Sequence, residues 1–260
     1  MFNKLLLEFN RDFSEIKKYK FNVIFANIAV LLMSLFIIDG LFVKEKEIVF
    51  LMMILWYYAT YAIESPAFLI QNEITDRTLI SIVQSKTGIL SVVLYRNLVE
   101  FLMNTIKVIV IFTLIFVSVN FDYSKFNHIP IIILVMVVSV FILYQLGTFL
   151  SSFTLLYKRL GSFVAPAETY MLFFGDITVK VNNKALVLIN KILFPFNNAR
   201  EIFTQLQLNN VRYDLIIQLL IQAVVLSVLV KISYDKNIQT SMKRGNLYGT
   251  QIRRITKIHR

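Results

Sequence analysis

Three polar side chains within one apolar run are the first candidates for chemistry in this sequence. Glu100, Asn104 and Lys107 stand at i, i+4 and i+7, so a helix places them on one face, where they can pair or line a water-filled cavity. Ionisable side chains at membrane depth are costly and usually mark a substrate, ion or proton pathway. The competing interpretation is that the run begins at the membrane surface and Lys107 extends its amine to the lipid headgroups.

Polar residues in two further apolar runs indicate the same kind of chemistry. Gln145 and Thr148 stand about one helical turn apart, and Glu168 follows Pro166 by two residues. A carboxylate near a proline in an apolar run must face protein or water. Hydrogen bonds between helices would explain Gln145 and Thr148 equally well. The candidates for a translocation pathway are therefore Glu100, Asn104, Lys107, Gln145, Thr148 and Glu168.

The sequence lacks the motifs of common enzymes. There is no G-x-x-x-x-G-K-[ST] phosphate loop, and the closest glycine pair, Gly245 and Gly249, has no lysine at the required place. H-E-x-x-H and G-x-S-x-G are absent, as is cysteine, and there are only two histidines. We expect no catalytic residue, no metal site and no cofactor on this chain. The remaining enzymatic alternative is an intramembrane lipid-modifying enzyme that uses Glu100 or Glu168.

Composition places these residues in a membrane protein. Hydrophobic residues make up 57% of the chain, charged residues 17%, and the mean hydropathy is +0.67. Several apolar runs approach the roughly 20 residues that cross a bilayer as a helix. We predict an all-α integral membrane protein, with a single domain over 1–260. The six predicted spans are 21–42, 48–63, 98–119, 130–155, 160–174 and 215–230. Because the fifth is short and contains Pro166, we expect it to be kinked or partly inserted.

Two segments outside the spans are predicted to lie at the membrane surface. Residues 1–20 carry an apolar stripe that includes Phe9, Phe13 and Ile16, typical of an interfacial amphipathic helix. A cleaved signal peptide is the alternative, but the apolar run that follows is too long for one. The apolar run 185–194 has about ten residues, too few to cross a bilayer. We therefore predict a short re-entrant segment before the last span.

The distribution of charge predicts the orientation. The formal net charge is +11. Lys and Arg are concentrated in the N-terminal helix and in the basic tail 233–260, whereas the short loops 43–47 and 120–129 hold few. Since basic residues favour the cytoplasmic side, both termini are predicted to be cytoplasmic. The tail is expected to be solvated or to contact anionic lipid, and no nucleic acid is expected as a partner.

A polar segment, Gln71–Arg96, interrupts the apolar runs. The first part of this segment, from Glu73 to Thr78, is mainly polar. An apolar run with helical spacing follows over 79–93. This pattern is typical of a helix that lies across a membrane surface and can present a rigid cytoplasmic face to another protein. An ordinary surface helix between two spans is the alternative.

The spacing within this segment resembles the second intracellular segment of ABC-2 type transporter permeases. That family typically has Glu, then Gly-Thr-Leu-Glu after a short gap, and Ser-Pro a few residues later. The present chain has Glu73, Thr78 and Leu79 at the matching spacing, with Ser85 where Ser-Pro would fall. The three positions that depart from the family pattern are Arg77, Ile80 and Lys86.

The resemblance implies the permease subunit of an ATP-driven exporter. Two such subunits, identical or related, would enclose a pathway, and separate ABC ATPase subunits carrying ATP and Mg would dock on residues 71–96 and on the N-terminal helix. The implied coupling residues are Glu73, Asp76, Arg77, Thr78, Leu79 and Ser85. Frequent Ile, Lys, Asn and Phe without Cys indicate an AT-rich bacterial genome, hence a bacterial cytoplasmic membrane and a peptide or drug-like amphipathic cargo. The alternative is a non-transport membrane protein, such as an immunity or sensory partner that binds a peptide.

Overall fold

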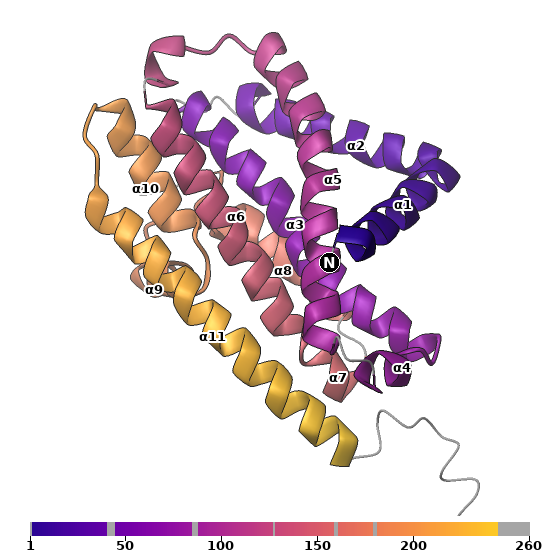
Figure 1. Ribbon diagram of the computed structural model, residues 1–260. Helices are drawn as coiled ribbons and strands as arrows, with labels where there is room; N and C mark the ends of the chain where they lie inside the picture. The colour runs from indigo at the N-terminus through magenta and orange to yellow at the C-terminus, as the bar shows by residue number, and fades with distance from the viewer. Residues whose placement is uncertain are drawn as a thin grey trace, which may run out of the picture.

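The computed structural model describes residues 2–40, 45–84, 88–126, 128–158, 161–178 and 181–243. Within these ranges the chain is helical and has no strand, which confirms the predicted all-α class (Figure 1). The long helices are α2 (Lys20–Leu35), α3 (Lys46–Thr75), α5 (Ile89–Ser118), α6 (Ile129–Ser151) and α11 (Tyr213–Lys243). The shorter elements are α1 (Phe2–Lys18), η1 (Phe36–Gly40), α4 (Leu79–Gln84), η2 (Tyr123–Phe126), α7 (Thr154–Tyr157), α8 (Gly161–Phe174), α9 (Lys184–Leu193) and α10 (Phe196–Gln207).

In the part of the chain that the structure describes, five helical segments are long and apolar enough to cross a membrane. They are Lys20–Gly40, Lys46–Thr75, Ile89–Ser118, Ile129–Tyr157 and Tyr213–Lys243. Even the shortest of these, with 21 residues, rises about 30 Å, which matches the hydrocarbon core of a bilayer. The described chain is therefore compatible with a multi-pass membrane protein.

The fifth predicted span is helix α8, which is shorter than the others. Its 14 residues rise about 21 Å, less than the hydrocarbon thickness. Among the described residues, five segments thus have the length to cross a bilayer unaided, whereas six were predicted. The predicted re-entrant run 185–194 coincides with α9, and Pro195 separates α9 from α10.

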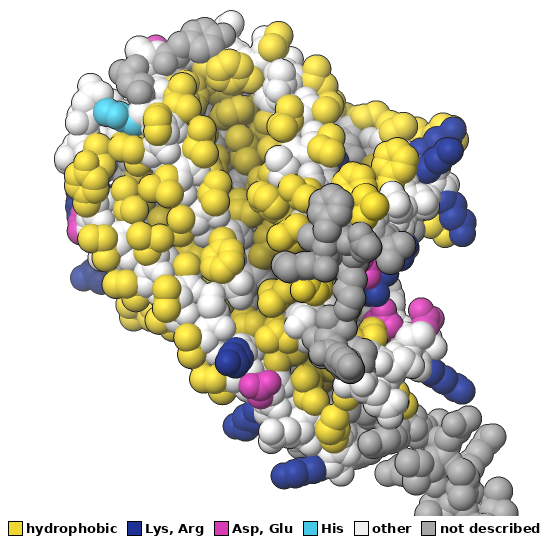
Figure 2. Space-filling view, in the orientation of Figure 1, with side chains coloured by type: hydrophobic (Ala, Val, Ile, Leu, Met, Phe, Trp, Pro, Cys, Tyr) yellow, Lys and Arg dark blue, Asp and Glu magenta, His cyan; other side chains and the backbone are white. Residues whose placement is uncertain are grey.

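Helix α3 is the centre of the bundle. In its most apolar window 72% of the residues are buried, against 17% in the corresponding window of Lys20–Gly40. It packs against α5, α6 and α8, while α11 packs against α6. Hydrophobic side chains are exposed on the outer helices, for example Phe25, Val117 and Val224 at 68%, 79% and 64% (Figure 2). The outer surface is therefore suited to lipid and the interior to helix packing.

Helices α6 and α11 run parallel, so the chain between them must travel back along the bundle. At their starts, His128 Nε2 lies 3.3 Å from Asn209 Oδ1. Further along, Ser151 Oγ and Tyr234 Oη share a hydrogen bond of 2.6 Å, and the Ser241 hydroxyl donates to the carbonyl of Leu155, 2.9 Å away. Helices α8, α9 and α10 therefore return the chain from the end of α6 to the start of α11.

Buried polar contacts hold this return segment in place. Asp176 is fully buried and has a left-handed φ of +61°. Its carboxylate accepts a hydrogen bond from Asn197 Nδ2 at 2.6 Å, and its carbonyl accepts one from Arg200 Nη1 at 2.9 Å. Arg200 Nη2 also pairs with Glu45 at 3.0 Å, just before α3 begins. These contacts join the turn after α8 to the start of the central helix.

Removing the N-terminal cap of α9 is expected to loosen that helix. Asn183 Oδ1 accepts hydrogen bonds from the amides of Ala185 at 3.0 Å and Leu186 at 3.4 Å. Asn183→Ala removes both and should cost about 1 kcal/mol, so amides in the first turn should exchange about five-fold faster. Hydrogen–deuterium exchange measures this, with Asn183→Ser, which keeps a capping oxygen, as the control. Unchanged exchange in Asn183→Ala would contradict the capping role.

Candidate functional site

Helix α3 ends in a corner that exposes three of the predicted coupling residues. Arg77 has a left-handed φ of +61°, which turns the chain after Asp76. The Thr78 amide donates to the Glu73 carbonyl at 3.0 Å, and the Thr78 hydroxyl donates to the Glu73 carboxylate. Asp76, Arg77 and Thr78 are exposed, whereas the side chain of Glu73 is only 14% exposed. The corner is thus a hydrogen-bonded, charged surface at the end of the central helix.

The surface helix predicted over 79–93 is divided in two. Helix α4 ends at Gln84, and Gly88 adopts a φ of +70° immediately before α5. Glycine enters this backbone region without the steric cost that a side chain would bring, so it permits the break. Leu79 and Val93 are nevertheless buried in one apolar cluster. The periodicity therefore identified side chains that pack together, although they belong to two helices.

An ion-pair network links this corner to the N-terminal helix and to α5. Arg96 Nη1 lies 2.9 Å from a carboxylate oxygen of Glu73, and Arg96 Nε lies 3.2 Å from one of Glu8. Glu8 also pairs with Arg11 on the next turn of α1, at 3.1 Å. The side chains of Arg96, Glu73 and Glu8 are only 15%, 14% and 23% exposed, so water screens these charges less than it screens a surface pair. Arg96 therefore connects α1, α3 and α5.

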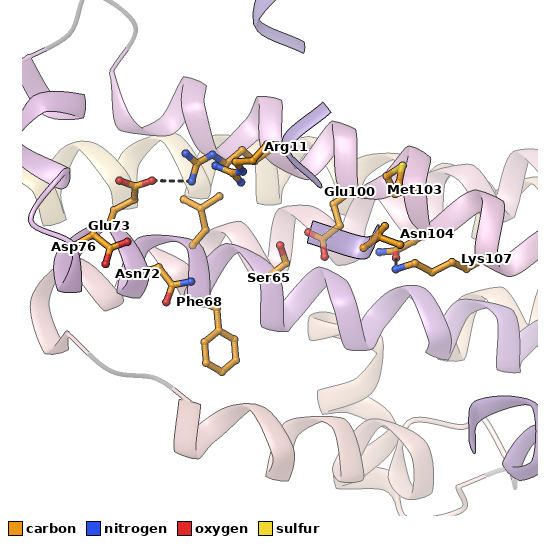
Figure 3. Close-up of a pocket in the computed structure, with 13 residues that line it drawn as sticks. Arg11, Ser65, Phe68, Asn72, Glu73, Asp76, Glu100, Met103, Asn104 and Lys107 are labelled. Atoms are coloured by element: carbon orange, nitrogen blue, oxygen red, sulfur yellow. Dashed lines mark hydrogen bonds and ion pairs between the residues drawn. The ribbon is translucent and has the colours of Figure 1, made fainter. Parts of the chain in front are cut away.

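A cavity of about 390 Å³ adjoins the network. It brings the predicted coupling residues Glu73 and Asp76 together with the predicted pathway residues Glu100, Asn104 and Lys107 (Figure 3). The lining also includes the apolar side chains of Ile16, Phe68, Leu69 and Met103. The cavity thus runs from the charged corner into the apolar part of α5, and its wall is amphipathic.

Lys107 is held inside this cavity. Its ammonium donates to Asn104 Oδ1 at 2.9 Å and lies 4.9 Å from the centre of the Tyr61 ring. Asn104 is fully buried. This end of the cavity therefore has a polar amide within the apolar part of α5. The geometry supports the shared-face interpretation of these two residues.

The other predicted site residues lie elsewhere. Gln145 and Thr148 line a separate groove between α5 and α6, where Asn97 Nδ2 donates to the Thr148 hydroxyl at 2.8 Å. Thr148 thus makes the interhelical hydrogen bond that the sequence left open as an alternative. Glu168 is half-buried on α8 and lines neither cavity. Ser85 falls outside the described residues.

Sequence reasoning assigned no role to Arg96 or Glu8, although they complete the network. The signal for Arg96 was present, since it stands four residues before Glu100 at the start of a long apolar run and needs a counter-charge there. Its partners are 23 and 88 positions away along the chain. No periodicity within one helix could therefore have named them.

The lining of the cavity mixes cationic, anionic and amide side chains with apolar ones. Across the described part of the chain, no group of three or more His, Asp or Glu side chains could hold a metal ion. Its role must be inferred from geometry and sequence pattern, because no protein-family model, no curated protein and no solved structure matches the chain.

Proposed function

We propose that this chain is the permease subunit of an ATP-driven ABC-2 type exporter in a bacterial cytoplasmic membrane. The observation that supports this most is the exposed corner at Asp76–Thr78, which Glu73 and Arg96 tie to α1 and α5. Such a corner offers an ATPase subunit a rigid, charged docking surface. ATP and Mg would be bound by that partner, and this chain would not be an enzyme.

Coupling would pass through the ion-pair network. An ATPase that moves the corner on binding ATP displaces Glu73, and Arg96 transmits the displacement to α5 and α1. Since Glu100, Asn104 and Lys107 lie further along α5, the shape of the cavity changes with the position of the corner. A ligand shifts such an equilibrium only by its differential contacts with the two states, and the corner is where these contacts would differ.

We further propose that both termini are cytoplasmic and that α8, α9 and α10 together make the sixth crossing. The parallel course of α6 and α11 supports this, because the return between them must cover the same distance. The interruption of the helix in this segment would be tolerated at membrane depth, because Asn197 and Arg200 donate hydrogen bonds to the polar groups of Asp176 in the turn. The segment would then combine a partly inserted fifth span with a re-entrant helix.

The remaining partners follow from the same proposal. A second copy of the chain, or a related permease, would complete the translocation pathway, and membrane lipids would cover the apolar outer faces. The amphipathic cavity suits a peptide or drug-like amphipathic cargo, with Lys107 and Asn104 contacting its polar part. No nucleic acid is proposed as a partner.

Reversing the charges of the exposed corner should separate the chain from its ATPase. In the double variant Asp76→Lys with Arg77→Glu, both side chains are exposed, so the bundle should keep its thermal stability. Two reversed contacts at an interface should lower ATPase recovery about ten-fold or more. The tagged chain would be purified in detergent from its native host, and co-eluting ATPase would be measured by mass spectrometry and by nucleotide hydrolysis.

The matched control is the exchange Arg212→Asp with Asp214→Arg, an exposed pair at the opposite end of the bundle. It should leave ATPase recovery unchanged. Equal recovery with the corner variant would show that Asp76 and Arg77 are not in the docking surface. If the unaltered chain elutes without an ATPase and without nucleotide hydrolysis, the exporter proposal fails and a peptide-binding immunity or sensory role is favoured.

A further inference from the structure

A second hollow of the molecule, of about 400 Å³, lies between α5 and α6. Its volume falls in the range of small-molecule sites. Three lining residues are strongly exposed at its rim, Leu98, Val137 and Phe141, at 47%, 56% and 46%. This groove, which we call the α5–α6 groove, is therefore open towards the apolar outer surface.

The α5–α6 groove has a polar floor with one unmet hydrogen-bond acceptor. Asn97 is 5% exposed, and its Nδ2 donates to the Thr148 hydroxyl at 2.8 Å. The Thr148 hydroxyl donates its one hydrogen bond to the carbonyl of Tyr144, 2.6 Å away, so it cannot also donate to Asn97 Oδ1. Asn97 Oδ1 has no hydrogen-bond partner within the described residues. A buried acceptor in this position costs free energy until a donor reaches it.

The lining also limits what the groove can bind. It holds no Asp, Glu, Lys or Arg, and its polar groups are amides and hydroxyls. A charged group would lose its hydration there without gaining a counter-charge, which disfavours ions and zwitterions. Aliphatic and aromatic walls favour a hydrocarbon chain instead. An open rim on the apolar surface means that such a molecule can enter sideways from a membrane.

We propose that the α5–α6 groove is a binding site for a neutral, single-chain amphiphile that enters from the bilayer. Its hydrocarbon chain lies between α5 and α6, and its hydroxyl or amide N–H donates to Asn97 Oδ1. This site does not depend on coupling to an ATPase, so it can be tested on the purified chain alone. The probe is 1-monoacylglycerol with a brominated acyl chain, and its comparison is the methyl ester of the same acid, which has no donor.

A fluorescent label at the rim reports binding. Because the chain has no cysteine, Val137→Cys carries a single bimane that the bromine atoms quench on contact. The chain is reconstituted in lipid nanodiscs and titrated with each probe. Binding to the groove gives saturable quenching by the monoacylglycerol and only a linear response to the methyl ester. Val117→Cys, on the exposed face of α5 outside the groove, should respond linearly to both.

Two variants of the labelled chain test the assignment of Asn97. Asn97→Leu removes the acceptor at similar volume, so the monoacylglycerol concentration for half-maximal quenching should rise about ten-fold or more, towards the methyl ester response. Leu98→Trp fills the groove and should abolish saturation. Linear quenching by both probes at both labels would overturn the proposal, since both probes would then be located only in the bulk lipid. Equal saturation by both probes would overturn the role of Asn97. Quenching at position 117 but not at 137 would overturn the proposal as a whole, since no probe would then reach the groove.

Discussion

Gly147→Ala is expected to destabilise the bundle by about 3 kcal/mol or more. A Cβ built on Gly147 lies 1.7 Å from the carbonyl oxygen of Ala62, an atom of the α3 backbone. Backbone cannot rotate away as a side chain can, so α6 must move off the central helix. The thermal unfolding temperature in detergent should fall by about 6–12 °C, as followed by fluorescence-detected size exclusion.

Ser139→Ala is the matched control for this result. Ser139 lies on the same helix and is fully buried, and its hydroxyl has no hydrogen-bond partner among the described residues. Removing that hydroxyl should leave the unfolding temperature unchanged or raise it slightly. If Gly147→Ala instead unfolds at the temperature of the unaltered chain, then α3 and α6 do not cross at Ala62 and Gly147.

Arg96→Ala should detach the N-terminal helix from the bundle. The substitution leaves Glu73 and Glu8 as two largely buried carboxylates without their shared cation, and removing one partner of a fully buried pair costs about 3–5 kcal/mol. Because these side chains are 14–23% exposed, we expect about 2–3 kcal/mol here. Amides of α1 should exchange hydrogen at least ten-fold faster. Under the exporter proposal, export should also fall while the ATPase keeps hydrolysing ATP.

The geometry of the guanidinium distinguishes this network from simple charge balance. Arg96 uses Nε for Glu8 and Nη1 for Glu73, which the single ammonium of Arg96→Lys cannot reproduce. That variant should therefore give intermediate exchange in α1. Arg212→Ala, which removes an exposed cation at the other end of the molecule, should leave α1 unchanged. A stable α1 in Arg96→Ala would remove the structural basis for coupling through Glu73.

The hydropathy of the sequence predicted where the helices lie more accurately than where they begin and end. The predicted span 48–63 lies inside α3, which continues to Thr75, and the predicted span 215–230 lies inside α11, which continues to Lys243. An apolar run marks only the part of a helix that suits a bilayer. The backbone ends the helix elsewhere, at the left-handed Arg77 in the case of α3. The fifth predicted span is too short to cross a bilayer unaided, because α8 has only 14 residues.

Local spacing was informative wherever the chemistry lay on one helix. Glu100, Asn104 and Lys107 share a face because 3.6 residues make one turn, and they do line one cavity. The same reasoning grouped Gln145 with Thr148, which line one groove. It could not show that these are two separate sites with different lining. Nor could it place Glu73 beside the first of them, since that requires the packing of α3 against α5.

The sequence by itself therefore determined the helical class, the apolar segments and the polar faces, because each depends on residues a few positions apart. Only the tertiary structure decided which charges meet, that Arg96 bridges Glu73 and Glu8, that Gly147 admits the Ala62 carbonyl, and that Asn97 keeps one acceptor unmet. These contacts join helices far apart in the chain. Their geometry follows from how the helices pack as a whole, which no local pattern encodes.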